Sequence, residues 1–137
     1  MSETVLELKN LKKNYGRFTA LYNLNLSIQK GEIIGLVGPN GAGKTTTLKL
    51  IAGLSSPTSG EILIQNKNGH LQNIRKNSKN LIDMGFLIDI PTLYNTTPNT
   101  LLKYIANITN YSKKTIKQRI DELLKSFSLY KWKFRKI

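Results

Sequence analysis

The sequence predicts an α/β fold in which a phosphate-binding loop connects a core strand to a helix, with an antiparallel β arm before it and helices after it. Three observations carry this prediction. Residues 38–46 contain the pattern G-x-x-x-x-G-K-[ST], apolar and polar residues alternate at 5–8 and 24–28, and apolar residues recur at helical spacing between 97 and 127. Together these patterns are typical of a phosphate-loop nucleoside triphosphatase.

The first two strands are predicted to form the β arm. Val5–Leu8 and Leu24–Ile28 alternate apolar and polar residues, as strands with one buried face do. The glycine-containing segment Asn14–Arg17 lies between them and is predicted to include the turn. The two strands should therefore pair in an antiparallel sense.

A core strand, the loop and its helix are predicted next. The apolar run Ile33–Val37 leads into the loop as a strand buried on both faces, and Thr47–Ala52 leads out of it as a helix. Residues 55–60 are rich in serine and also contain proline and glycine, which indicates a turn. Glu61–Ile64 then alternates as a further strand.

The rest of the chain is predicted to be a loop, a strand and two helices. The polar segment Gln65–Asn80 is predicted to be a loop with at most one helical turn, and Ile82–Ile88 a buried strand. Thr97 is expected to cap the first helix with Pro98 in its first turn, and the second helix to begin near Ser112. The apolar stripes expected to be core are Leu101, Leu102, Ile105 and Ile108 in the first helix, and Ile116, Ile120, Leu123, Leu124 and Phe127 in the second.

The loop predicts a site for the phosphates of a nucleoside triphosphate. Its glycines let successive backbone N–H groups turn toward phosphate oxygens, and the following helix N-terminus adds partial positive charge. Lys44 would supply a full positive charge, Thr45 a hydroxyl for Mg²⁺, and Thr46 a hydrogen bond to a phosphate oxygen. The candidate nucleotide-binding residues of the loop are Gly38, Asn40, Gly41, Ala42, Gly43, Lys44, Thr45 and Thr46.

Composition limits the class of protein further. The chain has 137 residues and no cysteine, which is the length of one domain and excludes disulfides and zinc-thiolate sites. No apolar run approaches the roughly 20 residues of a membrane helix, and the first residues lack the pattern of a signal peptide, so we expect a cytoplasmic chain. The formal net charge of +13 fits a solvated basic face or, as an alternative, nucleic-acid binding.

Around the loop, the chain resembles the ATPase domains of ABC transporters. Asn10–Gly16 is similar to the N-terminal arm of that family, and Gly31–Val37 and Ile51–Ile62 are similar to the segments on either side of its phosphate loop. The resemblance covers essentially the whole chain. It implies an ATPase core that binds ATP and Mg²⁺, with Tyr15 as the aromatic residue that stacks on adenine.

The segment Met84–Tyr94 resembles the glutamine-loop region of the same family, in the form found in bacitracin-type and lantibiotic-type peptide transporters. Asp89 stands at the position of the glutamine, so the resemblance implies that it reaches Mg²⁺ and the attacking water, through a water if its shorter side chain requires one. Lys44 and Asp89 are thus the candidate catalytic residues, and Thr45 and Asp89 the candidate metal ligands. A rival interpretation treats Phe86–Asp89 as a Walker B strand, which would put Ile90 where a catalytic glutamate belongs and leave no base.

Several family motifs do not occur in this chain. There is no Ser-Gly-Gly signature, no later strand ending in Asp-Glu and no switch histidine, and His70 falls in a polar turn where we expect it to be exposed. We therefore expect one partial ATPase domain, truncated before the signature. It would consist of a β arm at 1–30, a phosphate-loop core at 31–88, and the glutamine-loop region with the start of the helical subdomain at 89–137.

The resemblance also implies partners and a role. ABC ATPases sandwich ATP between two such domains and drive a membrane-spanning transporter subunit, so we expect an energy-coupling subunit on the inner face of the cell membrane. Export of, or immunity to, a peptide antibiotic or lantibiotic is the expected role, with ATP binding but little turnover by this chain alone. An unpaired apolar sheet edge would make the chain marginally stable or prone to aggregate.

Two further hypotheses stay open. The chain could be a truncated, noncatalytic product that retains nucleotide binding. It could also be a basic nucleic-acid binder that uses its C-terminal lysines, with Tyr130, Trp132 and Phe134 as stacking groups, although we expect no specific nucleic-acid partner.

Overall fold

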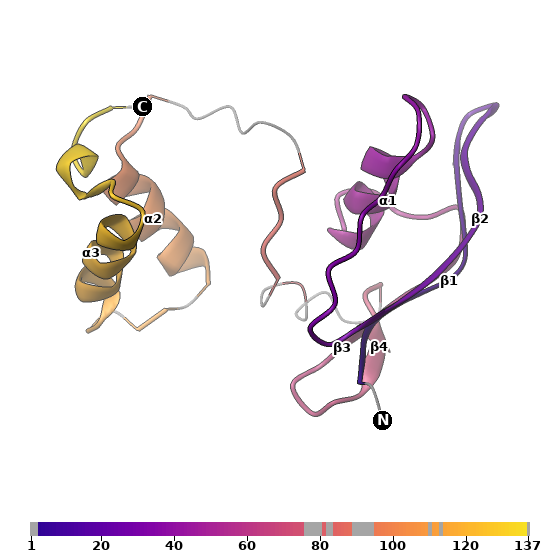
Figure 1. Cartoon of the computed structure of the whole chain (residues 1–137), viewed down its shortest axis with the longest axis horizontal. Coiled ribbons are helices and arrows are strands. Elements are labelled where there is room, and N and C mark those ends of the chain that lie inside the picture. The colour runs from indigo at the N-terminus through magenta and orange to yellow at the C-terminus, as the bar shows by residue number, and fades with distance from the viewer. Residues whose placement is uncertain are drawn as a thin grey trace. The chain divides into compact units, whose positions relative to one another are not determined.

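The structure is a computed structural model, and it describes residues 3–75, 81, 84–88, 95–109, 111–112 and 114–136. The chain divides into two compact units, Met1–Asp89 and Ile90–Ile137, which we describe separately. Figure 1 labels the helices and strands. The first unit contains β1 (Thr4–Tyr15), β2 (Phe18–Gln29), α1 (Lys44–Ile51), β3 (Ser59–Gln65) and β4 (Leu71–Asn73). The second contains α2 (Pro98–Ile108), α3 (Ile116–Ser126) and a short 3-10 helix, η2 (Tyr130–Trp132).

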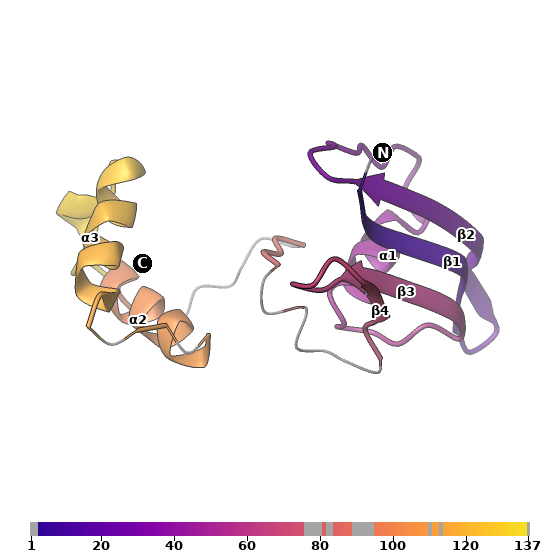
Figure 2. The same cartoon turned by 90° about the horizontal axis from the view of Figure 1, so that it is seen from below.

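The described residues of the first unit form an antiparallel sheet with the helix α1 on it. Four strands lie in the order β2-β1-β3-β4, and α1 lies over one face of this sheet in both views (Figures 1 and 2). β1 and β2 form a hairpin in which Tyr15 pairs with Phe18 across the turn. The predicted β arm is therefore confirmed, although both strands extend well beyond the residues that alternate.

The core of this unit lies between α1 and the sheet. Its most completely buried large side chains are Leu8 and Leu11 of β1, Ile62 of β3 and Leu50 of α1. Burying an aliphatic side chain of this size contributes about 1.5–3 kcal/mol relative to leaving it exposed. The same contacts fix the helix that follows the predicted phosphate-binding loop against the sheet.

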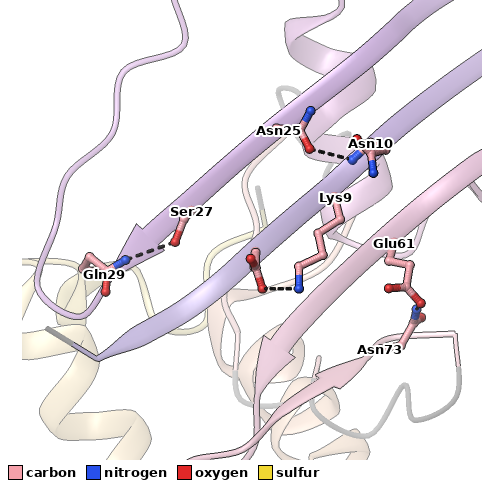
Figure 3. Close-up of polar contacts among 8 residues, drawn as sticks. Lys9, Asn10, Asn25, Ser27, Gln29, Glu61 and Asn73 are labelled. Atoms are coloured by element: carbon pink, nitrogen blue, oxygen red, sulfur yellow. Dashed lines mark hydrogen bonds and ion pairs between the residues drawn. The ribbon is translucent and has the colours of Figure 1, made fainter. Parts of the chain in front are cut away.

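The pairing of β1 with β2 is irregular near the middle of β1. The register with β2 shifts between Leu8 and Leu11, and Asn10 has a φ of 48°, which asparagine tolerates better than most residues. Its backbone N–H donates a 2.8 Å hydrogen bond to the side-chain oxygen of Asn25, as Figure 3 shows. β1 continues beyond this irregularity and ends at Tyr15.

Neither of the two segments predicted to be buried strands forms a strand in its described residues. Ile33–Val37 forms no strand, and Ile33 and Val37 are 100% and 97% exposed. Residues 84–88 form none either, and Leu87 is 80% exposed, while residues 82 and 83 lie outside the described part. A strand needs a neighbour for its backbone hydrogen bonds, and the strands of the described part pair only with one another.

The polar segment predicted as a loop contains a strand. β4 pairs with β3 through the register Leu63 to Asn73 and Gln65 to Leu71. The turn between them is closed by a 2.9 Å hydrogen bond from the Asn66 backbone N–H to the His70 backbone oxygen. His70 is exposed there, as expected.

The second unit begins as predicted. Thr97 caps α2 by accepting a 3.2 Å hydrogen bond from the Thr100 backbone N–H, and Pro98 occupies the first turn. α3 begins at Ile116, four residues later than the predicted start near Ser112. The Ser112 backbone oxygen accepts from the backbone N–H groups of Thr115 and Ile116.

Burial in this unit is less complete than the apolar stripes predict. Ile120 and Leu124 of α3 are buried, whereas no residue of α2 is, and Ile105, Ile108 and Phe127 are 46%, 61% and 68% exposed. Phe127 lines an open groove of about 700 Å³ between α2, α3 and η2, and Ile105 lines a smaller one of about 170 Å³ between α2 and α3. The core assignment of Ile105, Ile108 and Phe127 was therefore wrong.

Candidate nucleotide-binding site

The loop of the predicted phosphate site runs directly into α1, which begins at Lys44. Gly43 precedes the helix with a φ of +88°, a conformation that side chains other than glycine rarely adopt. A Cβ at this residue would lie 2.5 Å from the Leu21 Cδ2 atom and 2.7 Å from the Ala20 backbone oxygen. Glycine therefore lets the end of the loop pass directly against β2.

The N-terminus of α1 is open to a ligand. No side chain caps it, and its first turn contains no acidic residue. Backbone N–H groups in the first turn of a helix lack partners within the helix and carry partial positive charge, so they favour an anion. Thr47 closes the turn from within, because its hydroxyl and its backbone N–H both donate to the Gly43 oxygen, at 2.9 and 2.8 Å.

The Lys44 ammonium lies within the loop. It donates hydrogen bonds of 2.6 and 2.7 Å to the backbone oxygens of Gly38 and Pro39. An ammonium has three protons, so these two bonds hold it in place and leave one proton for a further acceptor. The arrangement gives the loop a positive charge with a fixed position.

A cavity of about 230 Å³ brings the loop and the β arm together. Its lining residues are Tyr15, Phe18, Ala20, Asn40, Gly41, Gly43, Lys44, Thr45 and Thr46. Seven of the predicted site residues thus meet in one place, although Tyr15 is 23 residues or more away from the loop in sequence. Gly38 and Ala42 do not line this cavity, and Gly38 contributes through its backbone contact with Lys44.

Phe18 and Ala20 line the cavity and were missed by the sequence reasoning. Phe18 is 61% exposed and Tyr15 48%, so two large aromatic residues that pair across the hairpin turn both remain open to solvent. The signal that could have identified Phe18 was its position three residues after Tyr15 in a predicted tight turn. Residues paired across such a turn point to the same face of the sheet.

Of the two candidate metal ligands, Thr45 and Asp89, only Thr45 is among the residues that the structure describes. Thr45 lines the cavity and is exposed, whereas Asp89 lies outside the described residues. Among the described residues, no group of three or more His, Cys, Asp or Glu side chains could hold a metal ion. A Mg²⁺ ion held by one or two protein oxygens, nucleotide phosphates and water needs no such group, so the residues present fit Mg²⁺ bound with a nucleotide.

The basic C-terminal segment is less available than its sequence indicates. Lys133 is buried, and its ammonium pairs with the Asp121 carboxylate at 2.6 Å. Several cations instead lie over neighbouring aromatic rings, for example the Arg135 guanidinium 4.6 Å from the centre of a Trp132 ring. Both kinds of contact occupy groups that the nucleic-acid hypothesis assigned to phosphates or bases.

In the part of the chain that the structure describes, none of the helices is long and apolar enough to cross a membrane.

Comparison with known proteins places the chain in a family. The family described as "ABC transporter" matches residues 21–137. The lantibiotic transport ATP-binding protein SrtF of Streptococcus pyogenes is 38% identical over 113 residues, which is 82% of this chain and 46% of that protein. The sulfate/thiosulfate import ATP-binding protein CysA of Pectobacterium atrosepticum is 36% identical over 120 residues, covering 87% of this chain and 36% of that protein.

A solved structure, described as the ATP binding subunit of an ABC transporter, matches the fold with a TM-score of 0.79 and 30% identity. That match covers 95% of this chain and 53% of the solved chain. The chain thus spans about half the length, or less, of the proteins it resembles. Because the family match runs from β2 through the loop to the C-terminal residues, the chain belongs to the ABC transporter family.

Proposed function

We propose that this chain is the nucleotide-binding portion of an ABC transporter ATPase subunit, and that it binds Mg-ATP in the cavity between the β1–β2 hairpin and the phosphate-binding loop. The observation that carries the proposal is the meeting of Tyr15 with Lys44 and Thr45 in one cavity. A cationic loop at one end and an aromatic ring at the other match the two chemically different ends of a nucleotide. The ATP-binding proteins to which the chain is similar support the choice of ATP.

Each residue has a defined part in this proposal. The open N–H groups of α1 and the Lys44 ammonium neutralise the triphosphate, and the Thr45 hydroxyl is a ligand for Mg²⁺. Tyr15 stacks on the base and Phe18 forms the adjoining wall. The ion, when bound, neutralises phosphate charge and orients the phosphates.

The test is nucleotide binding by Lys44→Ala. Removing a charged donor from a phosphate contact costs about 1.5–3 kcal/mol, which is roughly ten- to 150-fold in the dissociation constant for Mg-ATP. Isothermal titration calorimetry on the 137-residue chain measures this. Lys103→Ala, which removes the same charge from the exposed face of α2, is the matched control and should bind like the wild type.

Equal affinities of the Lys44→Ala and wild-type chains for Mg-ATP would show that the loop is not the site.

ATP hydrolysis requires more than binding, because phosphoryl transfer needs a positioned water and a base as well as bound nucleotide. The described residues that line the cavity include no Asp or Glu. We therefore expect this chain to bind Mg-ATP and to release phosphate very slowly.

That expectation keeps the noncatalytic product as a second candidate. The specific observation in its favour is the unpaired, exposed segment Ile33–Val37, which leads into the loop without the support of a sheet. Binding without turnover, even when a second complete ATPase domain is supplied, would favour it. Phosphate release that appears only with the second domain would favour a working part of an ATPase.

The wider role is a proposal as well. We propose that the chain works with a second ATPase domain and a membrane-spanning subunit, so that it lies at the inner face of the membrane, and that the transported substrate is a peptide antibiotic. Similarity to SrtF supports this substrate class, whereas similarity to CysA shows that relatives of other specificity are comparably close. Inactivating the gene should sensitise cells to a lantibiotic without affecting growth on limiting sulfate. The reverse result would overturn the substrate class.

A further inference from the structure

A cation covers the ring of Tyr15. The Lys13 ammonium lies 4.7 Å from the centre of that ring, within the distance of about 6 Å at which a cation is attracted to an aromatic face. The same ammonium donates a 2.7 Å hydrogen bond to the backbone oxygen of Ser56. Lys13 therefore ties the Tyr15 ring to the turn that follows α1.

Two further hydrogen bonds reinforce this tie. The Asn14 N–H donates to the Thr58 hydroxyl oxygen at 2.9 Å, and the Thr58 N–H donates to the Lys12 backbone oxygen at 2.9 Å. Residues 12–14 are thus joined to residues 56–58 by three contacts. The end of β1, which carries Tyr15, is in this way fixed to the segment that leaves the helix of the phosphate-binding loop.

Lys13 is outside the cavity that Tyr15 lines. The Tyr15 ring is 48% exposed and stands at the tip of a hairpin, where an unsupported side chain would sample several rotamers. A ring that is already oriented loses less conformational entropy when a ligand stacks on it. An ammonium held over the ring from outside the cavity supplies that orientation.

We propose that Lys13 is a positioning residue for base recognition: anchored on Ser56, it orients the Tyr15 ring for stacking on the base of a nucleotide in the cavity. The inference rests on the proposed nucleotide-binding function. The proposal predicts that Lys13 raises the affinity for ligands that have a base and does not affect the affinity for a bare phosphate chain. A general effect of positive charge on an anionic ligand would not make that distinction.

The experiment compares the affinities of the full chain for Mg-ATP and for magnesium tripolyphosphate by calorimetry. Lys13→Met keeps much of the side-chain length and removes the cation. It should weaken Mg-ATP binding by about two- to fivefold, the effect of one exposed cation–π contact, and leave tripolyphosphate binding unchanged. Lys13→Arg should retain wild-type affinity for both ligands, because a guanidinium also stacks on a ring and donates to a carbonyl.

The neighbouring residue supplies a matched control. The Lys12 ammonium lies 5.6 Å from the centre of the Tyr22 ring, which is 80% exposed and does not line the cavity. Lys12→Met therefore removes the same charge and the same kind of contact one residue away, and should leave both affinities unchanged. In a Tyr15→Leu chain, Lys13→Met should cause no further loss of ATP affinity.

Three results would overturn the inference. Equal weakening of ATP and tripolyphosphate binding by Lys13→Met would reduce its role to bulk charge. Unchanged ATP binding by Lys13→Met would refute the positioning role and leave the proposed function intact. A wild-type chain that binds neither ligand would overturn the proposed function, and this inference with it.

Discussion

Gly43 is a residue at which backbone conformation and packing both exclude a side chain. Its φ is +88°, and a Cβ there would contact Leu21 and the Ala20 backbone oxygen. Gly41 has nearly the same φ, +85°, but a Cβ there would have no neighbouring atom within 4 Å. A side chain at Gly41 would therefore cost only the free energy of an unfavourable backbone conformation, whereas one at Gly43 would also cost the free energy of a steric clash.

Substituting each of these glycines by alanine should show that difference. Gly41→Ala is expected to cost about 1–2 kcal/mol, the penalty of a left-handed conformation. Gly43→Ala should cost more, because it also pushes the loop away from β2. Urea unfolding followed by circular dichroism measures both free energies of unfolding, and equal costs for the two variants would contradict the close approach of the loop to β2.

At the scale of elements, Ile33–Val37 shows that an apolar, β-branched run does not become a strand by itself. Isolated extended backbone gains no ladder hydrogen bonds, and its apolar side chains gain nothing by ordering unless something covers them. In the described residues, β1 pairs with β2 and β3, β3 pairs with β1 and β4, and Ile33–Val37 pairs with none of these strands. The segment is consequently exposed in this chain.

Truncating the side chains of this segment should therefore have little effect on stability. The double variant Ile33→Ala/Val37→Ala is expected to change the free energy of unfolding by less than about 0.5 kcal/mol, as exposed substitutions usually do. It should also reduce self-association in sedimentation velocity, because it removes exposed apolar surface. Ile62→Ala, at a residue only 1% exposed, is the comparison and should cost about 2–5 kcal/mol. A similar cost for the double variant would mean that the segment is buried in solution.

At the scale of the whole molecule, charge is the dominant property. Lysine and arginine number 21 against eight aspartate and glutamate residues, which gives a formal net charge of +13. Such a field attracts any polyanion at low ionic strength and is screened within a Debye length of about 8 Å at physiological salt. Charge alone therefore predicts attraction without specificity.

Oligonucleotide binding should follow that rule. The chain is expected to bind a mixed-sequence single-stranded oligonucleotide in about 20 mM salt and to lose this binding by about 200 mM salt, because counterion release drives it. A sequence-shuffled oligonucleotide should behave identically in a fluorescence anisotropy titration. Binding that persists at the higher salt, or that distinguishes the two oligonucleotides, would revive the nucleic-acid hypothesis.

Local chemistry explains which parts of this protein were predictable. The pattern from Gly38 to Thr46 correctly predicted a loop that runs into a helix, and phosphate binding there stays a prediction based on glycine, lysine and threonine at fixed spacing. Alternation identified the β arm, and the Thr97-Pro98 pair identified the start of α2, because caps and period-two patterns are read from adjacent residues. The family resemblance was confirmed, and it supplied Tyr15 as a candidate that no local pattern would have singled out.

The sequence by itself therefore determined the loop, its helix, the β hairpin and the family. Only the tertiary structure decided which apolar segments are buried, because burial depends on neighbours that can lie anywhere along the chain: Ile33 and Phe127 look like core residues and are exposed. The tertiary structure also brought the Tyr15–Phe18 turn to the loop and anchored the Lys13 ammonium on Ser56, since contacts between segments far apart in the chain leave no signal in a single sequence.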